Sequence, residues 1–253
     1  MIEVKGISKT YRLGSKQQAE LGLSQPVFHA VNDVTFTCRP GVIHSLLGPN
    51  GAGKTTMLRM IATLLRPSAG SILVHGHDVQ QESREVREKI GFLTGSTNLY
   101  ERLTPVETVR YFGELNGMDR QRLHQRQEML FDQLGIQDFR NKRIGQLSTG
   151  MKQKVSIART MIHDPEVVVF DEPTSGLDVI SAASIIQLIR QCKAEGKTVI
   201  FSSHIMSEVD LLCDELAIIN KGRLIHQGTM EAFRRSAAGA SLTEAFIRTV
   251  TAA

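Results

Sequence analysis

Cysteine is scarce in this chain of 253 residues, which contains three: Cys38, Cys192 and Cys213. They are widely separated and form no C-x-x-C pair, which argues against a disulfide framework or a zinc site and favours buried side chains in a reducing compartment. No apolar run approaches the length that spans a bilayer, and residues 1–30 show no basic-then-apolar secretory pattern. The sequence therefore predicts a cytosolic chain that reaches a membrane only through a partner.

A strong excess of one charge is also missing. The chain has 30 Lys and Arg against 26 Asp and Glu, a net charge of +4, and the two signs are interspersed. The densest basic stretches, residues 120–126 and 140–143, fit a solvated helix face as well as an anionic partner, so we expect no nucleic-acid partner. No internal repeat is visible, and the length accommodates one large domain or one core with an inserted subdomain.

The strongest motif is a glycine-rich stretch with the G-x-x-x-x-G-K-[ST] spacing of a phosphate-binding P-loop. Glycines let successive backbone N–H groups converge on one anion, the lysine supplies a point charge, and the threonine hydroxyl suits Mg²⁺. An apolar run at 42–47 predicts a strand before the loop, and residues 54–65 have helical spacing, so a helix N-terminus would point at the phosphates. The residues of the motif are Gly48, Pro49, Asn50, Gly51, Ala52, Gly53, Lys54, Thr55 and Thr56.

Strand and helix patterns alternate along the chain, which predicts an α/β fold with a largely parallel sheet. Residues 2–4 are interpreted as an edge strand and residues 13–26 as a surface loop. Residues 105–116 and 120–134 show helical spacing with few strand signals, which favours an all-helical insertion over residues 95–150. His75, His77 and Asp78 form a polar turn, and a metal site there is disfavoured because no further ligand follows nearby.

A second candidate site lies at residues 167–172, where a run of apolar residues ends in Asp171 and Glu172. A carboxylate at the end of a buried parallel strand can hold Mg²⁺ beside a P-loop. A second carboxylate directly after it can orient and polarise an attacking water, which predicts hydrolysis. The alternative, two exposed acids that end a strand, stays open on these residues alone.

Three further segments carry a resemblance to a known family. Leu147-Ser148-Thr149-Gly150-Met151 is similar to the signature motif of ATP-binding cassette (ABC) ATPases, Ser175-Gly176-Leu177-Asp178 to their D-loop, and His204 to their switch histidine. With Tyr11, the P-loop and Asp171, these elements occur in the family's order. The resemblance implies an α/β P-loop NTPase fold, an ABC-type ATPase core with an antiparallel β subdomain and an inserted α-helical subdomain, in a single domain over 1–253.

The resemblance also implies roles, with ATP and Mg²⁺ as ligands. Tyr11 would stack on adenine and residues 48–56 would hold the phosphates, while Thr55 and Asp171 would hold Mg²⁺. The implied catalytic residues are Lys54, Glu172 and His204. Ser148 and Gly150 would cap the γ-phosphate of ATP on a second copy in a head-to-tail dimer, and Asp178 of the D-loop is a further implied nucleotide-binding residue. The implied partners are that second ATPase subunit and an integral membrane permease, at the cytoplasmic face of the cell membrane.

The sequence departs from the family pattern at three places. Thr149 and Met151 replace the usual glycine and glutamine of the signature motif, although the Ser-x-Gly core remains. Gly95 stands where the family has a glutamine near the metal and water. The long segment at 13–26 makes Phe28 an alternative to Tyr11 for the adenine contact.

The favoured function is the motor of an ABC exporter. Residues 57–65 and 152–178 resemble the exporter group that includes bacterial sodium-extrusion ATPases, and residues 98–104 resemble the surface that meets the membrane partner. Sodium export is the first hypothesis, and export of drugs or another cargo is the second. A non-transport ABC ATPase that acts on nucleic acid or ribosomes and a P-loop nucleotide kinase are the remaining alternatives.

Overall fold

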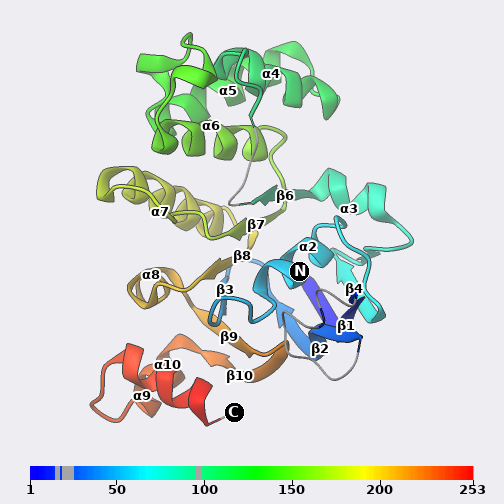
Figure 1. Cartoon of the computed structure of the whole chain (residues 1–253). Coiled ribbons are helices and arrows are strands. Elements are labelled where there is room, and N and C mark those ends of the chain that lie inside the picture. Colours follow the sequence, from blue (N-terminus) through cyan, green and yellow to red (C-terminus); the bar gives the residue numbers. More distant parts are fainter. Residues whose placement is uncertain (15–17, 19–25, 95–98, 253) are drawn as a thin grey trace.

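The computed structural model describes residues 1–14, 18, 26–94 and 99–252, whose strands form two sheets (Figure 1). A four-stranded sheet has the order β2-β1-β4-β5, and a six-stranded sheet has the order β10-β9-β3-β8-β7-β6. The strands are β1 (Ile2–Arg12), β2 (Val27–Cys38), β3 (Ile43–Leu47), β4 (Ala69–Val74), β5 (His77–Asp78), β6 (Ile90–Leu93), β7 (Val167–Asp171), β8 (Thr198–Ser203), β9 (Glu215–Asn220) and β10 (Arg223–Thr229).

The six-stranded sheet is parallel from β6 to β9, and only β10 runs antiparallel to its neighbour. Every residue of β3, β7 and β8 is buried. Strands buried on both faces need near-continuous apolar runs, which explains why the sequence pattern was readable. The predicted α/β fold with a largely parallel sheet is confirmed, and the carboxyl ends of β3, β7 and β8 meet at one edge.

The four-stranded sheet is antiparallel, and β1 lies inside it. Because β1 pairs with β2 on one side and β4 on the other, the prediction of an edge strand at residues 2–4 is wrong. Ile2, Val4 and Ile7 are buried while the residues between them are more exposed. This alternation reports one buried face, which central and edge strands share, so it could not distinguish them. His77 and Asp78, expected in a turn, form the short strand β5.

Helices cover the parallel sheet and form a separate group beyond it. Figure 1 shows α4, α5 and α6 together at one end of the molecule, with α9 and α10 at the other. The helices are α2 (Lys54–Ile61), α3 (Ser83–Lys89), α4 (Pro105–Leu115), α5 (Arg120–Leu134), α6 (Thr149–Met161), α7 (Val179–Ala194), α8 (Met206–Leu212), α9 (Met230–Ser236) and α10 (Leu242–Thr251), with 3₁₀ turns η1 (Gln137–Phe139) and η2 (Ile144–Gln146).

Between β6 and β7, the regular elements in the residues that the structure describes are helices and 3₁₀ turns. Thr104 and Glu107 form a capping box at the start of α4, with Pro105 as its first residue. Asp119 caps α5, which ends at Gly135 in a left-handed conformation. These local signals explain why the two helices were predicted to within a residue. Gly95, the departure from the family pattern, lies outside the described residues.

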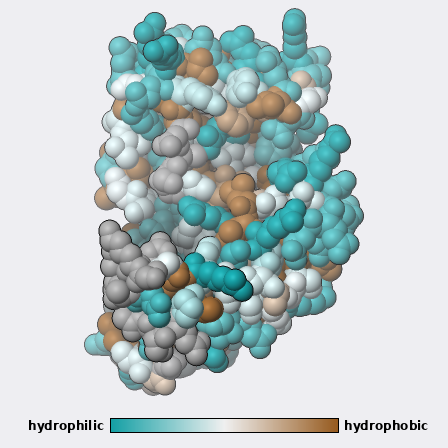
Figure 2. Space-filling model, turned by 45° about the vertical axis from the view of Figure 1, so that its right-hand side comes forward, coloured by the Kyte–Doolittle hydropathy of each residue, from teal (hydrophilic) through white to brown (hydrophobic). Residues whose placement is uncertain are grey.

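Buried apolar side chains form two clusters that meet at β3. Ile43 and Leu47 belong to the cluster that includes the helices between β6 and β7, whereas Leu46 belongs to the cluster beneath the antiparallel sheet. None of the helices in the described part of the chain is both long and apolar enough to cross a membrane. Figure 2 shows one face of the molecule, on which apolar residues occur in separate small groups among hydrophilic ones.

Candidate active site

The P-loop connects the end of β3 to the start of α2, and two of its glycines are required by close backbone contacts. A Cβ on Gly48 would lie 2.2 Å from the carbonyl oxygen of Ile219. Gly53 has a φ of +109°, and its Cβ would lie 2.4 Å from the carbonyl oxygen of Ala30. No side chain caps the N-terminus of α2, and its first turn holds no acid. The N–H groups of this helix start are therefore available to an anion.

Lys54 is the first residue of α2 and is only 5% exposed. Its Nζ donates hydrogen bonds to the carbonyl oxygens of Gly48 (2.7 Å) and Pro49 (3.1 Å). Burial lowers the pKa of Lys54, and the nearby carboxylates of Glu172 and Asp171 partly oppose that shift. An ammonium has three N–H donors, so the pair of carbonyls holds it at the loop and leaves one donor for a bound anion.

Asp171 ends β7 beside the P-loop, and it is buried, with 6% exposure. One carboxylate oxygen accepts hydrogen bonds from Thr55 Oγ1 (3.1 Å) and from Ser202 Oγ (2.7 Å). The same Ser202 hydroxyl accepts the backbone N–H of Glu172 at 3.0 Å. The alternative of two exposed acids is therefore wrong for Asp171. Ser202 was not singled out from the sequence, although its place near the end of β8, two residues before His204, was a usable signal.

Glu172 and His204 face each other from the ends of neighbouring strands. The two atoms His204 Nδ1 and Glu172 Oε1 lie 3.1 Å apart. Glu172 has a φ of 50°, a left-handed conformation that is strained for a residue with a side chain. Such strain persists only where surrounding contacts hold the backbone, as Ser202 does here.

A cavity of about 280 Å³ opens over the P-loop. Phe28 lines it, whereas Tyr11, the aromatic residue predicted to stack on the base, does not. Tyr11 lies opposite Phe28 in the β1–β2 pair, is 38% exposed, and has the Lys9 ammonium 5.3 Å from its ring. The lining residues are Phe28, Ala30, Asn50, Gly51, Ala52, Gly53, Lys54, Thr55, Thr56 and Glu172.

The remaining predicted residues form a second group that does not line this cavity. Ser148 caps α6, and Asp178 caps α7 through the N–H and hydroxyl of Ser181. A Cβ on Gly150 would lie 3.0 Å from Ser181 Oγ and 3.7 Å from an Asp178 carboxylate oxygen. The starts of α6 and α7 are thus adjacent, and a side chain at position 150 would press against the Ser181 hydroxyl.

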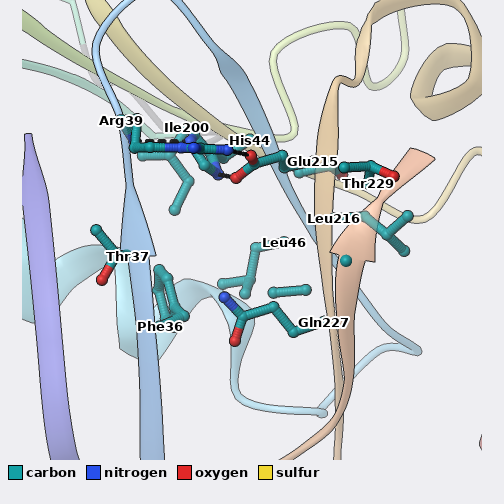
Figure 3. Close-up of a pocket in the computed structure, with 13 residues that line it drawn as sticks. Phe36, Thr37, Arg39, His44, Leu46, Ile200, Glu215, Leu216, Gln227 and Thr229 are labelled. Atoms are coloured by element: carbon teal, nitrogen blue, oxygen red, sulfur yellow. Dashed lines mark hydrogen bonds and ion pairs between the residues drawn. The ribbon is translucent and has the colours of Figure 1, made fainter. Parts of the chain in front are cut away.

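A larger cavity, about 520 Å³, lies near the other end of β3, between β2, β9 and β10 (Figure 3). The Arg39 guanidinium forms an ion pair with Glu215. The backbone N–H of Arg39 donates a hydrogen bond to His44 Nε2 at 2.8 Å. Burial, with Arg39 as a second cause, lowers the pKa of His44 to about 4. His44 is therefore neutral at pH 7, with its proton on Nδ1, 3.4 Å from Glu215. These groups satisfy one another.

The histidines at positions 75 and 77 each lie beside a carboxylate. His75 Nδ1 lies 2.9 Å from a carboxylate oxygen of Glu166, and His77 Nδ1 lies 3.1 Å from one of Glu82. In the described ranges, no three or more His, Cys, Asp or Glu side chains form a group that could hold a metal ion.

A P-loop with a buried lysine, a carboxylate at the end of the adjacent parallel strand and a second carboxylate in the cavity define a P-loop nucleoside triphosphatase. The sequence profile described as "ABC transporter" matches residues 31–175. The chain is 47% identical over 222 residues to "ABC transporter ATP-binding protein NatA" of Bacillus subtilis, an alignment that covers 87% of this chain and 90% of that protein. It is 37% identical to "Nod factor export ATP-binding protein I" of Burkholderia lata, over 85% of this chain and 71% of that protein.

Solved structures agree with the sequence relatives. The structure described as "ATP binding subunit of ABC transporter" has a TM-score of 0.86 and 28% identity, and the match covers 98% of this chain and 99% of the other. A dimeric, post-hydrolysis ATP-binding cassette bound to ADP and Pi has a TM-score of 0.80 and 26% identity, over 91% and 99% of the two chains. The chain belongs to the ABC transporter family as an ATP-binding subunit, and it is an ATP hydrolase of that class.

Proposed function

We propose that this chain powers an ABC exporter by hydrolysing ATP in the cavity over the P-loop. The observation that carries the proposal is the position of Glu172, which lines that cavity together with Lys54 and faces His204 at 3.1 Å. An acid and a histidine at hydrogen-bond distance beside a phosphate-binding loop suit the activation of a water for attack on a terminal phosphate.

In this proposal the P-loop residues 48–56 hold the phosphates and Lys54 neutralises their charge. Glu172 accepts a proton from the water as the water oxygen bonds to the γ-phosphorus. The bond between the γ-phosphorus and the bridging oxygen breaks, and ADP leaves with that oxygen. His204 contacts the γ-phosphate and orients Glu172. Phe28, and Tyr11 less directly, provide the aromatic surface for adenine.

The residues beside the phosphate site fit a magnesium ion. Thr55 Oγ1 and an Asp171 carboxylate oxygen lie 3.1 Å apart, and both are the hard oxygen ligands that Mg²⁺ takes in proteins. Thr55 and Asp171 would hold the ion, which neutralises phosphate charge when bound. Ser202 fixes the orientation of Asp171 through its 2.7 Å hydrogen bond.

We propose further that two copies share each ATP. Ser148, Gly150 and Asp178 lie together at the starts of α6 and α7, apart from the lining of the P-loop cavity. Helix N-termini that do not serve the chain's own nucleotide can serve one held by a second copy. The dimeric relative bound to ADP and Pi supports a head-to-tail dimer.

The proposed membrane partner is an integral permease, which would place the chain peripherally at the cytoplasmic face. Tyr100, Arg102 and Leu103, in the described part of the segment that resembles the partner-facing surface, line a surface cavity together with Tyr111 of α4. Tyr100 and Tyr111 are 62% and 47% exposed. The proposed organisation is one ABC ATPase domain over 1–253 with residues 95–150 as its helical insertion.

Sodium ions are the proposed cargo, on the strength of the segments that resemble sodium-extrusion ATPases and of the 47% identity to NatA. The relatives named for Nod factor export and daunorubicin resistance support export of another cargo as the alternative.

The test is affinity capture of the tagged chain from detergent-solubilised membranes of its host, followed by mass spectrometry. A stoichiometric permease supports the exporter, and vesicles that contain both proteins then report ATP-driven flux of ²²Na⁺ or of a drug. Capture of ribosomal or chromosomal proteins without a permease contradicts the proposal. The Glu172→Gln variant is the control, because it should bind the same permease without driving flux.

A further inference from the structure

Glu208, in the first turn of α8, connects the two segments that present Glu172 and His204. One carboxylate oxygen accepts a hydrogen bond from Thr174 Oγ1 at 2.5 Å, and the other accepts one from Ser203 Oγ at 3.0 Å. Thr174 lies two residues after Glu172, and Ser203 directly precedes His204. A single side chain outside the cavity lining therefore ties together the two backbones that determine the spacing of the pair.

The two hydroxyl groups that donate hydrogen bonds to Glu208 lie in the interior. Thr174 is 5% exposed and Ser203 is 2% exposed. Ser203 Oγ already accepts the backbone N–H of Ile205 at 3.0 Å, so its proton is directed to Glu208. Hydrogen bonds to an ionised acceptor are stronger than bonds between neutral groups. Loss of the carboxylate would leave two buried hydroxyl groups without a hydrogen-bond acceptor.

The segment on the Thr174 side needs such a contact because its backbone is strained. Glu172 has a φ of 50°, and Ser202 holds the N–H of that residue. Thr174 is the next side chain along this turn that is bonded to another element. Gln153 of α6 also donates a hydrogen bond to the Pro173 carbonyl oxygen at 2.9 Å, and the bond from Thr174 to Glu208 is the contact that links this turn to α8.

We propose that Glu208 is a positioning residue for ATP hydrolysis, which fixes the distance between Glu172 and His204 by binding Thr174 and Ser203 together. The inference rests on the proposed roles of Glu172 and His204. It goes beyond them because it predicts how their separation is maintained from α8.

The test compares the turnover number with ATP binding in the full chain. Glu208→Ala should lower kcat about 10- to 100-fold, since displacement of a reacting group by about 1 Å has that effect. The dissociation constant for ATP should change little, because no P-loop contact involves Glu208. The Tm should fall by a few degrees, because two buried hydroxyls lose their acceptor. Glu208→Gln keeps one acceptor oxygen for Ser203 Oγ, and its amide N–H can donate to Thr174 Oγ1, so it should recover kcat to within about threefold of the parent chain.

A matched control and a double-mutant cycle locate the effect. Asp210, on the same helix, pairs with Arg234, so Asp210→Ala should leave kcat unchanged. Thr174→Val removes only the hydroxyl and should lower kcat in the same direction. The double variant Glu208→Ala/Thr174→Val should cost no more than Glu208→Ala alone, because both changes break one connection.

Two results would overturn the inference while leaving the proposed function intact. One is a kcat for Glu208→Ala equal to that of the parent when Glu172→Gln is inactive. The other is a parallel loss of Tm, ATP affinity and kcat in Glu208→Ala that Glu208→Gln does not relieve, which would make the role structural. Absence of ATP binding by the parent chain would instead contradict the proposed function itself.

Discussion

The two ends of β3 carry cavities of opposite character. Near its start, Arg39, His44 and Glu215 line the larger one, about 520 Å³, and are bonded to one another. Beyond its end, Lys54 and Glu172 line the smaller one, about 280 Å³, and the hydrogen bonds that Lys54 makes go to backbone carbonyls. Volume alone would favour the first cavity as the functional site.

The difference teaches that a binding site for a charged ligand is recognised by hydrogen-bond donors and charges that the fold holds in place but does not pair with an opposite charge. A guanidinium paired with a carboxylate has little attraction left for a ligand, whereas a helix N-terminus and a lysine aimed at backbone carbonyls attract an anion. Variants matched between the two ends test this contrast directly.

The largest effect should come from Glu172→Gln. Loss of the group that accepts the proton of the water should lower ATP turnover by about 10³-fold while ATP still binds. Light scattering with saturating ATP and Mg²⁺ should then show an accumulated dimer. Glu215→Gln is the matched change at the start of β3 and should leave turnover unaffected. A monomer under these conditions, or an active Glu172→Gln chain, would break the contrast.

Lys54→Ala should act on binding. Removal of a buried charge from a phosphate contact should weaken ATP affinity by about 100-fold, or ~3 kcal/mol. Titration calorimetry measures it, with Arg39→Ala as the control cation at the other end of β3. Equal affinities for the two variants would mean that the P-loop cavity is not the nucleotide site.

His44 should make stability depend on pH at the start of β3. Its pKa in the folded chain is about 4, below the ordinary value of 6.5, so the unfolded chain binds more protons between these values. Stability is therefore present above pH 6.5 and is lost as the pH falls toward 4, by about 2 kcal/mol at pH 5. Urea unfolding from pH 7 to 5 measures it. His44→Asn should flatten the profile relative to the parent and to His29→Asn, and an unchanged profile would contradict this account.

Phe28→Ala should have the smallest of these effects, on ATP affinity, because the proposed contact of Phe28 is with the adenine base and not with the phosphates. Loss of one stacking side chain should weaken ATP affinity about 10-fold. Tyr11→Ala should weaken it less, because Tyr11 does not line the cavity. A larger effect of Tyr11→Ala than of Phe28→Ala would identify Tyr11 as the residue that stacks on adenine, as the sequence pattern favoured.

The sequence pattern predicted those features whose signals are local. The P-loop, the apolar run that ends in Asp171 and the capped helices at 105–134 each occupy one continuous stretch. Contacts between distant stretches were not predictable in this way: the bond from Glu208 to Thr174 spans 34 positions, and the pairing of β1 on both sides depends on β2 and β4. Phe28 could be named only as an alternative, because which aromatic ring enters the cavity depends on the register of β1 against β2.

The position of β3 between β8 and β9 has a consequence for synthesis of the chain. The strand that carries the P-loop ends at Leu47, but its hydrogen-bonded neighbours are residues 199–203 and 215–218. A ribosome that has released residues 1–180 has already made the P-loop, Asp171 and Glu172, yet neither neighbour of β3 exists. Closing contacts over such long separations is slow, so the sheet around the P-loop is completed only after residues 199–218 have left the ribosome, and a shorter nascent chain lacks the strands that flank β3.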